Sequence, residues 1–235
     1  MANRGHDVTS ALLFDLDGTL VDSDAQHFTA FRRIFTPHGI ALDLATYNRS
    51  IQGASNEVIG KIFLSHLTPE QRDAALDEKE ETYRAGLEGI EPIAGALALL
   101  DFADHRGFKR AVVTNAPRAN ADAVLTALGL DGRLPIVIIG GELPRSKPDP
   151  LPYLTALEKT GASATHSVAF EDSTPGVRAA AAAGLAVVGM MSSLNEETLV
   201  EAGALFATRD FTDPRIYDLI EARANAPTEG ENGRI

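Results

Sequence analysis

Short apolar runs that end in polar residues recur along this chain, and they constrain its fold more than any other feature. The first run covers Ala11–Phe14 and is followed by Asp-Leu-Asp-Gly. Four further runs follow in the second part of the chain, at residues 110–113, 135–139, 167–170 and 185–189. Runs of this length, bounded by polar residues, are typical of strands that are buried on both faces of a sheet.

Helical stretches separate the last four of these predicted strands. They cover residues 118–128, 150–159 and 176–183. Strands and helices that alternate in this way form a parallel sheet with right-handed crossovers and helices on both faces. We therefore predict an α/β fold with a three-layer, Rossmann-like core. Open sheets of this kind bind ligands at the carboxyl ends of their strands.

The region between the first strand and the second departs from this alternation. Residues 26–87 carry apolar side chains at helical spacing, as in Phe28, Phe31, Ile34 and Phe35, and show no convincing strand. We predict an all-helical insertion over the carboxyl edge of the sheet. The expected division is a discontinuous core domain of residues 1–21 and 93–225, an inserted cap domain of residues 22–92 and a disordered tail of residues 226–235.

Two carboxylates follow the first strand directly. Asp15 and Asp17 are two residues apart, so their side chains can project to the same side, and Gly18 allows the backbone to turn sharply. One carboxylate could attack phosphorus while the other protonates the leaving oxygen and later activates water. Taken alone, the pair is explained almost as well by turn or cap residues at the end of a strand.

Polar groups also follow the second and third predicted strands. Thr114 and Asn115 lie at the start of a helix, where a hydroxyl and backbone N–H groups would bind a phosphoryl group or, alternatively, only cap the helix. Lys147 comes after the third strand. It could hold a phosphate and an attacking carboxylate together by offsetting their charge, and the alternative is a solvated loop lysine.

The fourth predicted strand ends in two acidic residues, Glu171 and Asp172. Acidic residues directly after a buried strand are costly unless they bind a partner, and a hard cation with oxygen ligands is the natural one. Mg²⁺ takes few carboxylates, so Asp15, Asp172 and the backbone carbonyl of Asp17 would be enough. Glu171 is then either a further ligand or a group behind the ligands. Together the four strand ends indicate a phosphate-ester hydrolase.

The charge of the chain limits its partners. Lys and Arg number 21 against 33 Asp and Glu, which gives a formal net charge of -12. A surface of this sign repels nucleic-acid phosphates and anionic lipid, so we expect neither nucleic acid nor membrane as a partner. The chain has no cysteine, and no apolar stretch approaches the roughly 18 residues that a membrane span needs. We expect a cytoplasmic monomer.

Taken together, the motifs resemble those of the haloacid dehalogenase (HAD) superfamily, specifically its phosphatase branch with a helical cap between the first motif and the second. They match in order as Asp15-Leu16-Asp17-Gly18-Thr19, Thr114-Asn115, Lys147-Pro148 and Glu171-Asp172. The resemblance implies an HAD-like core and a Mg²⁺ cofactor. It also implies Asp15 as the nucleophile, Asp17 as the acid and base, and Thr114 and Lys147 as positioning groups. Dehalogenases of the superfamily generally lack the second aspartate, so Asp17 indicates phosphate chemistry.

Within this branch the chain is similar to the β-phosphoglucomutase and sugar-phosphate phosphatase group, through His27, Gly53, and Lys79 with Tyr83. The similarity implies that His27, Gly53 and Lys79 contact the substrate, whereas His27 and Lys79 on amphipathic helices are more often plain surface residues. In the mutases a cap arginine binds the second phosphate of the substrate, and here Asn56 stands at that position. The missing arginine favours a monophosphate substrate.

Three functions stay open at this point. The leading one is a Mg²⁺-dependent phosphatase that hydrolyses a small phosphorylated metabolite, such as a sugar or polyol phosphate, through an aspartyl phosphate. The second is a phosphosugar mutase, favoured by His27 and Lys79 and opposed by Asn56. The third is a phosphate-binding protein without activity. A binder has no need for Asp17, which argues against it.

Overall fold

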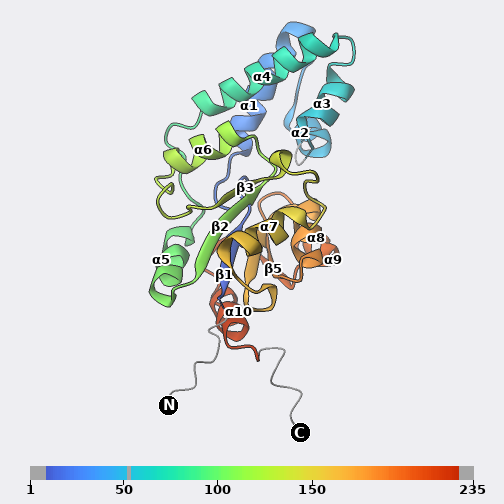
Figure 1. Cartoon of the computed structure of the whole chain (residues 1–235). Coiled ribbons are helices and arrows are strands. Elements are labelled where there is room, and N and C mark those ends of the chain that lie inside the picture. Colours follow the sequence, from blue (N-terminus) through green and yellow to red (C-terminus); the bar gives the residue numbers. More distant parts are fainter. Residues whose placement is uncertain (1–8, 52–53, 228–235) are drawn as a thin grey trace, which may run out of the picture.

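The computed structural model describes residues 9–51 and 54–227, and their six-stranded sheet is parallel throughout (Figure 1). The strands are β1 (Ala11–Phe14), β2 (Lys109–Thr114), β3 (Val137–Ile139), β4 (Val168–Glu171), β5 (Ala186–Met190) and β6 (Phe206–Thr208). Their order in the sheet is β3-β2-β1-β4-β5-β6. The predicted parallel α/β fold is confirmed. The strand β6 was not predicted.

Helices cover both faces of the sheet, and each face has its own apolar core. Leu12 and Phe14 of β1 point to the face covered by α5 (Ala96–Arg106), α6 (Arg118–Ala127) and α10 (Pro214–Ala224). Leu13 points to the opposite face, which is covered by α7 (Leu151–Thr160), α8 (Thr174–Ala182) and α9 (Glu196–Ala202). Because both faces are buried, every residue of β1 is apolar, as a strand in the middle of a doubly covered sheet requires.

The insertion after β1 consists of helices that pack on one another at the carboxyl edge of the sheet (Figure 1). They are α1 (Asp24–Phe35), α2 (Leu44–Ser50), α3 (Asn56–Phe63) and α4 (Pro69–Ala85), with a short 3-10 helix at Thr36–His38. Phe31, Phe35, Ile59 and Leu76 belong to their shared core, which is separate from the two cores of the sheet. The predicted all-helical insertion is therefore present, and we call it the cap.

The two connections between the cap and the sheet run side by side. Val21 in the first connection forms a β-bridge with Pro92 in the second, and the N–H of Ile93 donates to the carbonyl of Leu20 at 2.9 Å. A further bridge joins Val21 to Asp17. Both connections thus lie next to the first motif. The division at residues 21 and 92 stays a prediction, and the predicted tail lies outside the described residues from residue 228 on.

None of the helices in the described part of the chain combines the length and the apolar composition needed to cross a bilayer. The cytoplasmic location and the monomeric state stay predictions.

The Thr19 side chain is fully buried, and its hydroxyl has no hydrogen-bond partner among the described residues. A buried hydroxyl without a partner costs about 1–3 kcal/mol. We expect Thr19→Val, which exchanges the hydroxyl for a methyl group, to leave the free energy of unfolding unchanged or to raise it by about 1 kcal/mol in urea titrations.

A matched control for Thr19→Val is Thr114→Val. Thr114 is buried too, but its Oγ1 accepts a 3.0 Å hydrogen bond from the N–H of Ala116. This variant should therefore lose about 1 kcal/mol. An equal loss at Thr19 would contradict the prediction, because it would show that the Thr19 hydroxyl has a partner in solution.

Candidate active site

The predicted motifs meet because of the strand order. The sheet places β1 between β2 and β4. The chain runs outward from β1 to β2 and β3 and then returns to β4 on the other side of β1, and this reversal is the switch point where open α/β sheets bind ligands. Asp15 follows β1, and its N–H donates to the carbonyl of Phe170 at 3.0 Å. Thr114 and Glu171 are the last residues of β2 and β4. Groups more than 150 residues apart in the sequence therefore share one edge.

Lys147 lies at the centre of this edge. Its Nζ donates to Asp15 Oδ1 at 2.6 Å, to the carbonyl of Val113 at 2.6 Å and to Glu171 Oε1. Burial alone would lower the pKa of Lys147, but the charges of Asp15 and Glu171 outweigh it and raise this pKa above its usual value. Lys147 is therefore a buried cation and not a solvated loop lysine, as the alternative interpretation held.

Three carboxylates crowd together beside Lys147. Asp15, Glu171 and Asp172 each offer an oxygen, and these oxygens lie within 4.8 Å of one another. Burial raises the pKa of Asp172 well above its usual value, and the charges of Asp15 and Glu171 raise it further. Burial also raises the pKa of Asp15, although Lys147 opposes this effect. One lysine does not offset three carboxylates, so the cluster fits a divalent cation with oxygen ligands.

The backbone at Gly18 allows Asp172 to come close. Gly18 has a φ of 79°, and a Cβ there would overlap Asp172 Oδ2. The loop after β1 thus packs directly on Asp172, whose Oδ2 also accepts a 3.0 Å hydrogen bond from Ser192 Oγ. Any other residue at position 18 would push apart the two loops that carry the carboxylates.

Glu171 differs from the other two carboxylates because both of its oxygens have protein partners. Oε1 accepts from the hydroxyl of Tyr153 at 2.6 Å as well as from Lys147, and Oε2 accepts from Ser173 Oγ at 3.3 Å. The side chain has no exposed surface. The sequence left Glu171 as either a further metal ligand or a group behind the ligands. These contacts favour the second role, in which Glu171 orients Lys147.

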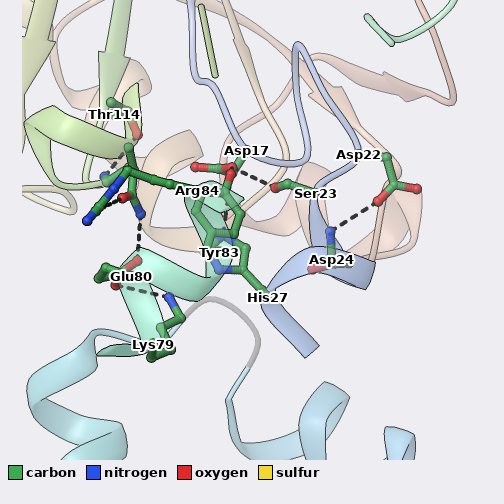
Figure 2. A network of polar contacts seen from close by, with 12 residues as sticks. Asp17, Asp22, Ser23, Asp24, His27, Lys79, Glu80, Tyr83, Arg84 and Thr114 are labelled. Carbon is green, nitrogen blue, oxygen red and sulfur yellow. Dashed lines mark hydrogen bonds and ion pairs between the residues drawn. The ribbon is translucent and has the colours of Figure 1, made fainter. Parts of the chain in front are cut away.

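Asp17 points toward the cap (Figure 2). Its Oδ1 accepts from Ser23 Oγ at 2.6 Å and from the hydroxyl of Tyr83 at 2.8 Å, and His27 Nε2 lies 3.7 Å away. Burial alone would raise the pKa of Asp17, but the nearby His27 and the hydrogen bonds of Ser23 and Tyr83 lower it to about 2. Its carboxylate is not in the cluster of three. Metal binding by the backbone carbonyl of Asp17 stays a prediction.

The predicted phosphate-binding residues have local partners. Thr114 Oγ1 accepts a hydrogen bond from the N–H of Ala116, and this bond lies in the turn before α6. Asn115 is exposed, and its Nδ2 donates to the carbonyl of Lys147 at 3.4 Å. Asn115 thus connects the end of β2 to the loop that carries Lys147. Phosphate binding by either side chain stays a prediction.

The predicted substrate contacts in the cap have different surroundings. The ring of His27 stacks on Tyr83 at 4.0 Å between centroids and faces Asp17. Lys79 is only 3% exposed, and its Nζ lies 3.0 Å from Glu80 Oε1 and 4.7 Å from the centre of the Phe31 ring. The interpretation of Lys79 as a surface residue is wrong, and in this conformation it is paired inside the cap. Gly53 lies outside the described residues.

Sequence reasoning did not find several residues that hold the site together. Tyr153 on α7 and Ser192 after β5 belong to no motif, and they reach Glu171 and Asp172 only through the packing of the sheet. Ser23 is the residue directly before α1, and its small polar type was the one signal that could have drawn attention to it.

The fold and this edge define a class of protein, namely a capped α/β enzyme with an acidic, lysine-containing centre at a topological switch point. The comparisons with known proteins then identify its family. A family model of haloacid dehalogenase-like hydrolases matches residues 9–184, and the chain belongs to this family. It is an HAD-type phosphatase with a helical cap, a phosphoric monoester hydrolase that acts on phosphorylated small metabolites. The family uses a divalent metal.

Two relatives and one solved structure illustrate the similarity. A phosphorylated carbohydrates phosphatase of Thermotoga maritima is 32% identical over 203 residues, which cover 83% of this chain and 92% of the relative. A phosphoglycolate phosphatase of Rhodospirillum rubrum is 32% identical over 210 residues, which cover 86% of this chain and 87% of the relative. The crystal structure of a putative beta-phosphoglucomutase from Thermotoga maritima superposes with a TM-score of 0.73 at 26% identity, covering 90% of this chain and 100% of that one.

Proposed function

We propose that this chain is a Mg²⁺-dependent phosphatase for a sugar or polyol monophosphate, and that the reaction passes through an aspartyl phosphate on Asp15. The observation that carries the proposal is the 2.6 Å contact between the buried ammonium of Lys147 and Asp15 Oδ1. The ammonium offsets the repulsion between the Asp15 carboxylate and the phosphate of the substrate, so the carboxylate can approach phosphorus and attack it.

The proposed reaction has two steps. A carboxylate oxygen of Asp15 attacks phosphorus, the bond from phosphorus to the ester oxygen breaks, and Asp17 gives a proton to the leaving oxygen. Asp17 then takes a proton from water, which attacks the aspartyl phosphate, so that phosphate leaves and Asp15 is restored. The low pKa of about 2 keeps Asp17 ionised at neutral pH, which is the form that the second step requires. For the first step Asp17 must carry a proton, which it takes from the phosphate monoanion of the incoming ester, and after the second step it returns the proton gained from water to the solvent.

Asp15, Asp172 and the backbone carbonyl of Asp17 would hold the Mg²⁺ ion, with Glu171 behind them. When bound, the ion supplies positive charge that offsets the carboxylates and the phosphate. The support for this set is the crowding of Asp15, Glu171 and Asp172 within 4.8 Å.

Mg²⁺ should raise the melting temperature of the protein, because it binds the folded cluster and relieves the repulsion among its carboxylates. At 100 times its dissociation constant the ion contributes about 2.7 kcal/mol. We expect this rise in a thermal melt with Mg²⁺ but not in Asp172→Asn, which keeps the shape of the side chain and loses its charge. Asp77→Asn is the matched control, because Asp77 is exposed on α4. An equal rise in Asp172→Asn and Asp77→Asn would argue against this metal site.

Two observations support a sugar or polyol monophosphate as the substrate. One relative of the chain is a phosphatase of phosphorylated carbohydrates. In the cap, Asn56 stands where the mutases carry an arginine, and its amide donates to Glu80. An uncharged amide that is already paired is a poor partner for a second phosphate.

The test is a panel of phosphomonoesters with Mg²⁺, containing sugar phosphates, polyol phosphates and phosphoglycolate, with Asp15→Asn as the background. Phosphate release from sugar or polyol monophosphates above this background is the expected result. Release from phosphoglycolate alone would overturn the substrate class, and no release from any ester would overturn the proposed function.

A phosphosugar mutase is the second candidate, and the observation in its favour is that His27 and Lys79 are both present in the cap. To separate the two, β-glucose 1-phosphate is incubated with a trace of the bisphosphate. Formation of glucose 6-phosphate would favour the mutase. Formation of free glucose alone would exclude it.

A further inference from the structure

The cap helix α4 contacts the core through a buried amide, the side chain of Asn120. Asn120 lies in the first turn of α6 and is 2% exposed. Its Nδ2 donates to Glu80 Oε2 at 2.6 Å, and its Oδ1 accepts from Arg84 Nη1 at 2.8 Å. Glu80 and Arg84 are four residues apart on α4 and therefore lie on the same face of this helix (Figure 2). The cap thus binds both ends of one core amide.

The carboxylate of Glu80 is also bound from within the cap. Its Oε1 accepts from Lys79 Nζ at 3.0 Å and from the amide of Asn56. A buried carboxylate is costly unless it is paired and hydrogen-bonded, and here Lys79 supplies the charge while Asn56 and Asn120 supply the hydrogen bonds. Lys79 is buried because it pairs with Glu80, and Glu80 is the residue that contacts Asn120 of the core.

Tyr83 follows Glu80 by three residues on the same helix. Its hydroxyl donates to Asp17 Oδ1 at 2.8 Å, and its ring stacks on His27. A helix advances 1.5 Å per residue, so a slide or rotation of α4 that breaks the contacts of Asn120 also moves Tyr83 away from Asp17. The position of α4 that satisfies Asn120 is the one that places Tyr83 on the proposed acid and base.

We propose that Glu80, Arg84 and Asn120 form a clamp that holds the cap on the core, and that these three are positioning residues for Asp17. The clamp keeps α4 against α6, and α4 keeps Tyr83 and His27 on the Asp17 carboxylate. This role rests on the proposed function, since it assumes that Asp17 transfers protons. The closure of the cap on the core does not depend on that assumption and is tested separately.

The first variant is Asn120→Asp, which keeps the shape of the side chain, removes the donor to Glu80 and sets two carboxylates against each other. We expect backbone hydrogen exchange to rise in α4 and in the connections at residues 16–23 and 86–93. We also expect kcat to fall by about 10- to 100-fold, with a smaller change in KM. Asn48→Asp on the exposed face of α2 adds the same charge to the cap and should change neither quantity.

The second variant adds Glu80→Gln to Asn120→Asp. The new amide can donate to the new carboxylate, while its oxygen still accepts from Lys79 and Asn56. Positions 80 and 120 thus swap the roles of donor and acceptor. The protection of the backbone from hydrogen exchange and most of the lost kcat should therefore return. A role limited to general stability would not produce this rescue. If Asn120→Asp does not fold, Arg84→Met removes the other half of the clamp and should raise exchange in the same segments.

Hydrogen exchange is measured without metal or substrate, so the clamp can be judged even if no ester is hydrolysed. Unchanged exchange in a folded Asn120→Asp protein, or exchange that Glu80→Gln does not restore, would overturn the clamp. Raised exchange with unchanged kcat would overturn the positioning role and leave the proposed function intact. Absence of phosphate release from the wild-type protein would overturn the proposed function alone.

Discussion

Asp15→Asn should lower phosphate release by about 10⁴-fold or more, because an amide does not replace the carboxylate that attacks phosphorus. The fold should persist, since the side chain keeps its size and its oxygen can still accept from Lys147. One negative charge also leaves a crowded cluster, where burial and Glu171 raise the pKa of Asp15. We therefore expect the metal-free variant to melt at or above the temperature of the wild type. Phosphate release and circular dichroism melts measure the two effects.

Asp77→Asn serves again as the control for Asp15→Asn, because it makes the same substitution at an exposed position of the cap. It should keep full activity. Phosphate release by Asp15→Asn within tenfold of this control would show that Asp15 is not the nucleophile. A large drop in melting temperature would instead show that the loss of activity comes from unfolding.

Lys147→Met should be the most destabilising of the substitutions considered. It removes a buried cation and leaves Asp15 and Glu171 without the charge that offsets theirs. Breaking a buried ion pair from one side costs about 3–5 kcal/mol, and we expect a loss of this size in the free energy of unfolding near neutral pH. Activity should fall as well, because attack on a phosphate then lacks its neutralising group.

The pH dependence of this loss follows from the direction of the carboxylate shifts. The pKa of Asp15 is raised in the folded protein, so its protonation stabilises the fold as the pH falls from about 7 toward its usual value of 3.8. Without Lys147 this shift grows. The gap between Lys147→Met and the wild type should therefore narrow as the pH falls toward about 7 and stay constant below it, because Asp15 is then protonated in both folded proteins. Mg²⁺ should raise the melting temperature more in the variant.

Lys61→Met is the matched control for Lys147→Met. Lys61 pairs with Glu57 on the surface of α3, where both side chains are more than half exposed. Exposed pairs contribute about 0–1 kcal/mol, so this variant should unfold nearly like the wild type. Equal losses in the two lysine variants would contradict the burial and pairing that we assign to Lys147.

Lys147 and Lys79 show why some cap residues were harder to interpret than core residues. Both lysines are buried, but Lys147 follows a strand at the ligand-binding edge, where the topology fixes its neighbours. Lys79 lies in the middle of a 17-residue helix, and helical spacing does not say which neighbouring helix each face meets. Its pairing with Glu80 depends on the contact between α4 and α6, which no local pattern contains.

The sequence alone determined the parallel sheet, the place of the helical insertion and the four groups at the strand ends. It could do so because a strand buried on both faces requires a continuous apolar run, and the charged residues that follow such runs stand out. The tertiary structure alone decided three further features: the short strand β6, the binding of both oxygens of Glu171, and the clamp at Asn120. These depend on distances between residues that are far apart in the chain, and such distances are set by packing.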